Sequence, residues 1–168
     1  MEHHDDSVLG SAASDPATVL SHDEAAVPDW WTSDEWATPP HVFEQIDDLF
    51  GPFDLDPCCR VETRKAPHYY VKADDGLARA WGYPSVFVNP PYSNPRPWIV
   101  KAIEQIRLRF TRRVVMLLPA ATDTTWFHDL VLPHADVIFM RGRIRFHGPD
   151  GKPKGTPKGG TILAVFPK

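Results

Sequence analysis

The tetrapeptide Asn89-Pro90-Pro91-Tyr92 combines residue types that suit the recognition of a planar amine. Proline has no backbone N–H and a fixed φ angle, so two in succession leave a rigid stretch of backbone that only accepts hydrogen bonds. The side-chain oxygen of Asn89 and the carbonyl of Pro90 offer two acceptors, which match the two donors of an NH2 group. Tyr92 adds a flat face on which a planar base can stack. The tetrapeptide therefore predicts a clamp for an aromatic amine.

The residues before this tetrapeptide predict a buried strand that positions it. Residues 86–88 are apolar and run directly into Asn89. Residues 53–56 predict a second short strand, which ends on Asp56 and is followed by Pro57. Because ligands of open α/β sheets bind beyond the carboxyl ends of the strands, we expect Asp56 and Asn89 to line the same crevice.

The rest of the chain alternates between helical and strand patterns. A helix over residues 39–50 is predicted after Thr38 as N-cap, and a helix over residues 95–110 after Asn94 as N-cap. Further predicted elements are a strand over residues 114–118, a short helix after Asp123, and two strands over residues 137–146 and 161–166 that form a long antiparallel hairpin. This order predicts an α/β fold with a mostly parallel sheet and an antiparallel C-terminal hairpin.

Length and composition indicate one domain with an acidic extension. The chain has 168 residues and a mass of 19.0 kDa, and its first 36 residues contain nine Asp and Glu but no Lys or Arg. We expect residues 1–35 to form a disordered acidic tail and residues 36–168 to form a single domain. No apolar run is long enough for a bilayer span and no signal-peptide pattern is present, so we expect a soluble, cytoplasmic protein without membrane contact. The adjacent Cys58 and Cys59 exclude a framework of intrachain disulfide bonds.

Positive charge is concentrated in the second half of the chain. Residues 37–168 carry a formal charge of +5, and the part from Arg96 onward carries +8. Six basic residues stand in or after the first strand of the predicted hairpin, namely Arg141, Arg143, Arg145, Lys152, Lys154 and Lys158. The arginines alternate along one strand face and the lysines follow in a Gly- and Pro-rich loop, which predicts contact with a polyanion such as nucleic acid. The alternative is an edge strand that its charges protect from aggregation.

Over residues 36–166 the chain resembles the amino-group DNA methyltransferases that use S-adenosylmethionine, and more narrowly the small phage-type DNA N6-adenine methyltransferases. Asn89-Pro90-Pro91-Tyr92 matches the catalytic motif of this family residue by residue. Three further segments are similar to its cofactor-binding elements, namely Thr38-Pro39-Pro40, Asp56-Pro57-Cys58-Cys59 and Asp74-Asp75-Gly76-Leu77. Two more are typical of the phage-type group, namely Leu117-Leu118-Pro119-Ala120 and Arg141-Gly142-Arg143-Ile144-Arg145-Phe146. The chain departs from the family pattern at Arg60-Val61-Glu62, where Gly-x-Gly is expected.

This resemblance implies a Rossmann-like S-adenosylmethionine-dependent methyltransferase fold and methyl transfer to N6 of adenine in double-stranded DNA. The target base would be flipped out of the duplex and held by Asn89, Pro90, Pro91 and Tyr92 during direct transfer, without a covalent enzyme intermediate. The cofactor S-adenosyl-L-methionine is expected to contact Thr38, Pro39, Asp56, Pro57, Cys58, Asp74 and Asp75. The six basic residues of the C-terminal part are then expected to contact DNA.

Alternative functions stay open at this point. The same tetrapeptide would suit other NH2 groups, namely those of cytosine N4, RNA adenine or a protein glutamine. A DNA-binding relic without cofactor is a further alternative, because the usual glycines are absent. The eight histidines show no metal-binding spacing, so no metal site is expected. The oligomeric state is open, and a monomer is favoured.

Overall fold

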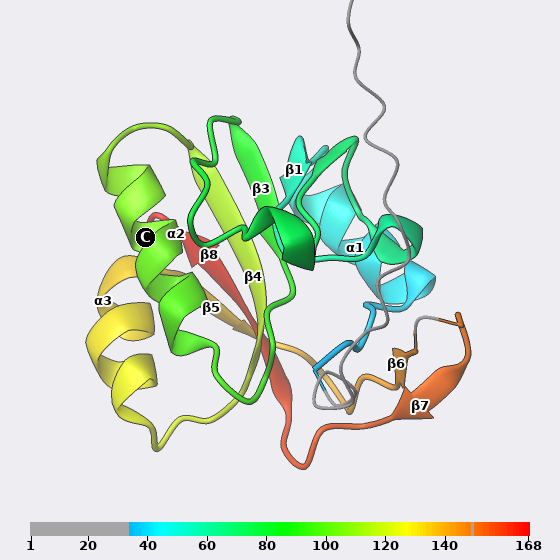
Figure 1. The fold of residues 1–168 in the computed structure, drawn as a ribbon. Coiled ribbons are helices and arrows are strands. Elements are labelled where there is room, and N and C mark those ends of the chain that lie inside the picture. The colour runs from blue at the N-terminus through cyan, green and yellow to red at the C-terminus, as the bar shows by residue number, and fades with distance from the viewer. Residues whose placement is uncertain (1–33, 149) are drawn as a thin grey trace, which may run out of the picture.

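The computed structural model of the protein describes residues 34–148 and 150–168, and its centre is a six-stranded sheet (Figure 1). The strands are β1 (Leu55–Asp56), β2 (His68–Tyr69), β3 (Ser85–Val88), β4 (Arg113–Pro119), β5 (Asp136–Phe139) and β8 (Thr161–Phe166). They lie in the order β2-β1-β3-β4-β8-β5. The first four strands of this order pair in parallel, whereas β8 pairs antiparallel with both β4 and β5. The predicted α/β fold with a mostly parallel sheet and an antiparallel C-terminal hairpin is therefore confirmed.

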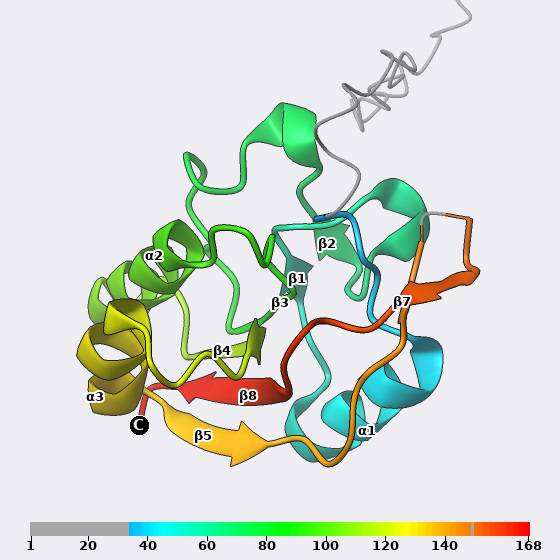
Figure 2. The same cartoon turned by 90° about the horizontal axis from the view of Figure 1, so that it is seen from below.

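Helices cover both faces of the sheet (Figure 2). Helix α1 (Pro40–Phe50) lies on one face. Helix α2 (Arg96–Arg107) lies on the other, together with a π-helical segment η4 (Phe127–Val131) that continues into α3 (Leu132–His134). Two short 3-10 helices, η2 (Val61–Thr63) and η3 (Lys72–Asp74), and a two-stranded hairpin of β6 (Phe146–His147) and β7 (Pro153–Gly155) complete the elements. The structure is thus a three-layer α/β sandwich.

The core has two parts because successive side chains of a strand point to opposite faces of the sheet. On β3, Val86 and Val88 belong to the cluster under α2, whereas Phe87 belongs to the cluster under α1. All three side chains are fully buried. Burial on both faces explains why the central strands have continuous apolar runs rather than alternating patterns.

Several boundaries differ from the sequence predictions. Helices α1 and α2 begin one residue later than predicted, with Pro39 and Pro95 as N-caps, and α2 ends at Arg107 rather than at residue 110. A further proline stands in the first turn of each helix, Pro40 and Pro97, where the missing N–H needs no helical partner. The predicted strand over residues 137–146 is wrong in its second half. Strand β5 ends at Phe139, and the chain then leaves the sheet to form the separate β6–β7 hairpin.

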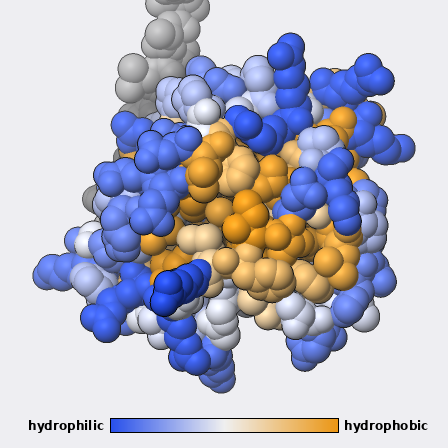
Figure 3. All heavy atoms as spheres, turned by 180° about the vertical axis from the view of Figure 1, so that it is seen from behind, coloured by the Kyte–Doolittle hydropathy of each residue, from blue (hydrophilic) through white to orange (hydrophobic). Residues whose placement is uncertain are grey.

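The face of the molecule that is turned away in Figure 1 has a broad apolar area (Figure 3). Large apolar side chains that are exposed among the described residues include Leu49 of α1 and Ile138 and Phe139 of β5. None of the described helices has both the length and the apolar composition that crossing a bilayer requires.

The topology brings the two predicted strand ends together. Strands β1 and β3 are parallel neighbours, with Leu55 opposite Val86. Their carboxyl ends therefore deliver Asp56 and Asn89 to the same edge of the sheet.

Candidate functional site

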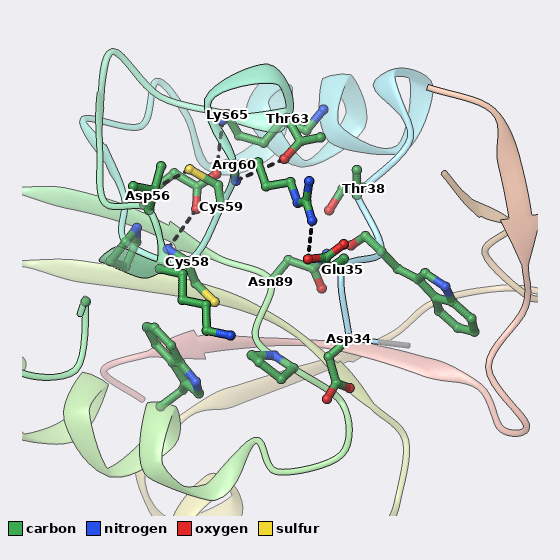
Figure 4. Close-up of a pocket in the computed structure, with 18 of the residues that line it drawn as sticks. Asp34, Glu35, Thr38, Asp56, Cys58, Cys59, Arg60, Thr63, Lys65 and Asn89 are labelled. Atoms are coloured by element: carbon green, nitrogen blue, oxygen red, sulfur yellow. Dashed lines mark hydrogen bonds and ion pairs between the residues drawn. The ribbon is translucent and has the colours of Figure 1, made fainter. Parts of the chain in front are cut away.

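A cavity of about 340 Å³ opens at this edge of the sheet (Figure 4). Its lining comes from four segments of the chain and from Phe87 of β3: residues 34–38, here called the strap, residues 56–65, residues 71–77, and residues 89–98 after β3. We call this space the large cavity. Its volume falls within the range of about 300–1,000 Å³ that is usual for small-molecule and cofactor sites.

Asp56 is the buried carboxylate of the large cavity. It is 2% exposed and accepts hydrogen bonds from the backbone N–H groups of Cys58 (3.3 Å) and Lys65 (3.0 Å). Burial raises the pKa of Asp56 to about 6, although these two hydrogen bonds and the nearby Lys65 ammonium oppose the shift. Burial and the Asp56 charge also raise the pKa of the Cys58 thiol, so this cysteine is a neutral wall residue.

Asp75 and Gly76 also line the large cavity, beside the loop that follows Asp56. Asp75 has a positive φ of 53° and accepts from the N–H groups of Leu77 and Ala78, which fixes a tight turn. A Cβ atom at Gly76 would lie 2.1 Å from the carbonyl oxygen of Pro57, so only glycine allows the two loops to approach this closely. This glycine was not identified as a structural requirement from the sequence, because the close approach joins loops 19 residues apart.

Asn89 is held in one orientation by the strap. Its side-chain Nδ2 donates a hydrogen bond of 2.7 Å to the backbone carbonyl of Trp36. This contact uses the donor side of the amide and leaves Oδ1 as the acceptor side. The strap thus fixes which way the predicted acceptor points.

The strap is itself attached at several points. Asp34 accepts hydrogen bonds from the backbone N–H and the hydroxyl of Ser93, directly after the tetrapeptide. Glu35 forms an ion pair with Arg60 (Figure 4). Sequence reasoning assigned Asp34 and Glu35 to the acidic tail, yet both line the large cavity. The remainder of the predicted tail, residues 1–33, lies outside the described residues.

A much smaller space is also lined by Asn89. Its volume is about 10 Å³, so it holds at most about one water molecule. We call it the small cavity, and its lining consists of Asp34, Trp36, Asn89, Pro90, Tyr92 and Phe146. The ring of Phe146 stacks on Trp36 at 5.8 Å and meets Tyr92 edge-on at 5.6 Å. Burial also raises the pKa of Tyr92. Asp34, Trp36 and Asn89 line both cavities.

The basic C-terminal residues lie beside the small cavity. Phe146 belongs to β6, and the backbone of His147 exchanges two hydrogen bonds with Ala37 of the strap, of 2.8 and 3.1 Å. The segment around this hairpin contains the six predicted contacts Arg141, Arg143, Arg145, Lys152, Lys154 and Lys158, all of them exposed. The three arginines do not stand on a strand as predicted, but in the irregular segment between β5 and β6. The predicted alternation nevertheless holds for burial, because the arginines are exposed whereas Ile144 and Phe146 are buried.

Most of the residues predicted to bind a cofactor meet at the large cavity. Thr38, Asp56, Pro57, Cys58 and Asp75 line it. Two do not: the buried Pro39 caps α1, and Asp74 faces away to accept from Val71 N–H and to pair with Arg79. Trp98 also lines the cavity, and its ring stacks on the buried Trp81.

Sequence reasoning missed three residues that shape the site. Arg60 stands where glycine was expected, and the side chains of Trp36 and Phe146 close the small cavity. The aromatic residues are 110 positions apart, so no local pattern pairs them. In the sequence, these residues could have been noticed only by their type and position. Arg60 directly follows one motif, and Trp36 and Phe146 stand beside or at the end of two others.

The sequence of the chain matches one protein-family model and is similar to two phage proteins. The family model described as DNA N-6-adenine-methyltransferase (Dam) matches residues 25–166. The DNA N-6-adenine-methyltransferase of Escherichia phage T1 is 34% identical over 108 residues, which is 64% of this chain and 44% of that protein. The DNA N-6-adenine-methyltransferase of Haemophilus phage HP1 is 35% identical over 115 residues, which is 67% of this chain and 66% of that protein. The chain therefore spans less than two thirds of the length of both relatives.

A solved structure has the same general fold. A protein from Pyrococcus horikoshii, described as "a putative RNA methyltransferase", superimposes with a TM-score of 0.50 and 15% sequence identity. The superposition covers 85% of this chain and 91% of that one. At this identity the similarity extends to the α/β fold and no further.

Proposed function

The chain belongs to the DNA N-6-adenine-methyltransferase (Dam) family, and from this premise we propose that it methylates N6 of adenine in double-stranded DNA with S-adenosyl-L-methionine. The observation that carries the proposal is that Asn89 lines both cavities, while the bond from its Nδ2 to the Trp36 carbonyl leaves Oδ1 as the acceptor. In the proposal, the large cavity holds the cofactor and the region of the small cavity receives the flipped base. Asn89 then stands at the boundary that the methyl group must cross.

The large cavity fits the proposed cofactor. Besides its volume, it has an unsatisfied polar group in its wall: Thr38 is 2% exposed, and its hydroxyl has no hydrogen-bond partner within the described part of the chain. A buried hydroxyl without a partner is costly unless a ligand or water supplies one. We propose that Thr38, Asp56, Pro57, Cys58 and Asp75 hold the cofactor. When bound there, S-adenosyl-L-methionine would supply an electrophilic methyl group on sulfur.

The residues of the tetrapeptide would activate the amine. In this proposal Oδ1 of Asn89 and the carbonyl of Pro90 accept hydrogen bonds from the two N–H groups of adenine N6. These contacts favour a pyramidal nitrogen whose lone pair is available for attack. Because Trp36 already fixes the Asn89 amide, the acceptor is oriented before the base arrives, and pre-orientation of this kind lowers the barrier without a covalent intermediate.

The small cavity would have to open before a base could enter. At about 10 Å³ it has no room for a purine, and Phe146 covers an edge of Tyr92. We propose that contact of DNA with the basic segment around β6 and β7 accompanies this opening. The position of Arg141, Arg143, Arg145, Lys152, Lys154 and Lys158 on the segment that contains Phe146 supports this, because phosphate contacts orient a duplex over a site. We further propose that the domain comprises the strap as well as residues 36–168.

A direct assay tests this function. Purified protein is incubated with labelled S-adenosyl-L-methionine and unmethylated duplex DNA, and the nucleosides are separated by mass spectrometry. We expect N6-methyladenine in the wild type and about a 10²- to 10³-fold lower rate in Asn89→Ala, because one of the two acceptors is lost.

Gln45→Ala is the matched control for this assay, because it removes another side-chain amide, at an exposed position of α1. It is expected to leave the rate unchanged. N4-methylcytosine, methylated RNA or methylated protein as the preferred product would replace this proposal with one of the other NH2 substrates. Full activity of Asn89→Ala would remove the role given to the amide.

A further inference from the structure

The ion pair between Glu35 and Arg60 is unusual in its position. Both side chains line the large cavity, and Figure 4 shows them pointing toward each other across it, with Thr38 beside them. The Glu35 side chain is only 8% exposed and that of Arg60 is 28% exposed. The desolvation of two charges is costly, so an ion pair in a cavity wall is weak evidence for a stabilising role. It therefore invites a functional explanation.

Arg60 also stands where the cofactor loop was expected to have glycine. A glycine would let the backbone approach a ligand, whereas Arg60 instead directs a guanidinium into the large cavity. Two other basic side chains line this space. Lys65 lies beside Asp56, and Lys72 is exposed. Arg60 is thus the basic side chain that is paired with a buried carboxylate and lies next to the unpartnered Thr38 hydroxyl.

We propose that the Arg60–Glu35 pair receives the zwitterionic α-amino-acid end of the cofactor, with Arg60 taking the carboxylate and Glu35 the ammonium group. This inference rests on the function proposed above and identifies residues at the same site. A guanidinium has five N–H donors and a carboxylate has two acceptor oxygens, so each can hold a ligand group while the pair stays intact. The hydroxyl of Thr38 supplies a third contact.

Charge balance favours a zwitterion over a simple anion. The pair has no net charge, and the amino-acid end of the ligand has none either. A free carboxylate would meet the Glu35 charge as well as that of Arg60, and a free amine would meet Arg60. Only a group that carries both charges side by side matches both residues, and the low exposure of Glu35 strengthens each contact.

Two ligands separate this contact from the rest of the cavity. S-adenosylhomocysteine has the amino-acid end, and 5′-methylthioadenosine lacks it while keeping the adenine, ribose and sulfur. We expect Arg60→Gln and Glu35→Gln each to weaken S-adenosylhomocysteine binding about 10- to 100-fold in titration calorimetry, the usual value of a charge-assisted hydrogen bond. The affinity for 5′-methylthioadenosine is expected to stay within about 2-fold of the wild type.

Two further variants make the test selective. Lys72→Gln removes a positive charge that lines the same cavity and interacts with Glu35, but this charge is exposed and screened by solvent, so we expect at most about a 3-fold change with either ligand. The double variant Arg60→Gln/Glu35→Gln leaves no unpaired buried charge, so it distinguishes ligand recognition from damage to the fold. It is expected to weaken S-adenosylhomocysteine binding at least as much as either single variant and to bind 5′-methylthioadenosine normally.

Other results would overturn the inference. Tighter binding of S-adenosylhomocysteine by Glu35→Gln would mean that Glu35 competes with the ligand for Arg60. Equal losses with both ligands, or an equal loss in Lys72→Gln, would mean that the pair only supports the cavity or its general charge. If the wild type binds neither ligand, the proposed function fails and the inference fails with it. If it binds both equally tightly, the inference alone is wrong.

Discussion

The two cavities that share Asn89 differ in volume and in the side chains that line them. The large cavity has a volume of about 340 Å³ and is lined by charged, polar and apolar side chains near the carboxyl ends of β1 and β3. The small cavity has a volume of about 10 Å³ and is bordered by the rings of Trp36, Tyr92 and Phe146. Under the proposed function, a cofactor would fit the large cavity as it stands, whereas a base would require the aromatic side chains of the small cavity to move.

The strap belongs to both cavities and couples them. Asp34, Trp36 and Asn89 line both spaces. The strap is joined to the large cavity through the Glu35–Arg60 ion pair and to the basic hairpin through two backbone hydrogen bonds between Ala37 and His147. A ligand that alters either attachment would therefore act on the segment that orients Asn89.

The charge buried in the large cavity gives the largest predicted effect. The pKa of Asp56 is about 6 in the folded protein and about 3.9 in an unfolded chain, so the folded state binds the proton more tightly. The contribution of Asp56 to the free energy of unfolding is therefore most favourable below about pH 4. It decreases by on the order of 3 kcal/mol as the pH rises to about 6 and above.

Urea unfolding of the wild type and of Asp56→Asn between pH 4 and pH 7 measures this contribution. Asparagine does not titrate, so the difference between the two curves isolates Asp56 from the other carboxylates. We expect the free energy of unfolding of the wild type to fall relative to that of Asp56→Asn across this range. Parallel curves would mean that Asp56 is solvated and that the large cavity lacks a buried charge.

The shape of the large cavity gives the second effect. Gly76→Ala would place a Cβ atom 2.1 Å from the carbonyl of Pro57 and 3.2 Å from the ring of Trp98. Both loops that form the cavity wall would have to shift, which lowers the free energy of unfolding by roughly 1–3 kcal/mol. Because the shifted wall no longer fits the ligand, we also expect about 10-fold weaker binding of S-adenosylhomocysteine. Gly82→Ala is the control, because a Cβ atom there has no neighbour within 4 Å. If Gly76→Ala leaves the affinity for S-adenosylhomocysteine unchanged, the wall of the large cavity can shift without affecting the ligand.

The same contrast explains what could be predicted from the sequence. The central strands and the two motifs at their ends follow local patterns, so Asp56 and Asn89 were correctly expected at one edge. The strand predicted through Arg141, Arg143 and Arg145 failed because alternating charged and apolar residues also occur in an irregular segment that buries Ile144 and Phe146. A pattern fixes which side chains are buried more reliably than it fixes the backbone hydrogen bonds.

The small cavity and the strap could not be predicted, since they depend on contacts between distant residues. Trp36 meets Phe146 and Asn89, and Glu35 meets Arg60, at separations of 25 to 110 positions. The acidic composition of the first residues predicted one uniform tail, and nothing local distinguished Asp34 and Glu35 from the residues before them. Only the contacts of Asp34 and Glu35 in the folded chain distinguish these two residues from the acidic residues before them.

Trp36 is the strap residue that contacts both Asn89 and Phe146, so its substitution tests how the strap orients Asn89. Its carbonyl orients Asn89, and its ring rests on Phe146 at 5.8 Å. Trp36→Ala removes the ring that holds this backbone in place, so we expect kcat to fall about 10-fold, which corresponds to roughly 1.4 kcal/mol, with little change in the KM for DNA. Trp36→Phe keeps a stacking ring and should stay within about 3-fold of the wild type.

A purely structural role for Trp36 makes a different prediction. It would lower the melting temperature and the amount of folded enzyme, and phenylalanine would not restore kcat per folded molecule. Trp36 also lines the large cavity, so some loss of S-adenosylhomocysteine affinity is expected, but the positioning role predicts that kcat per folded molecule falls more than this affinity and that phenylalanine restores it. If Trp36→Ala raises kcat, opening of the small cavity must limit the rate. The closed small cavity would then limit turnover, and Asn89 would keep its orientation without the Trp36 ring.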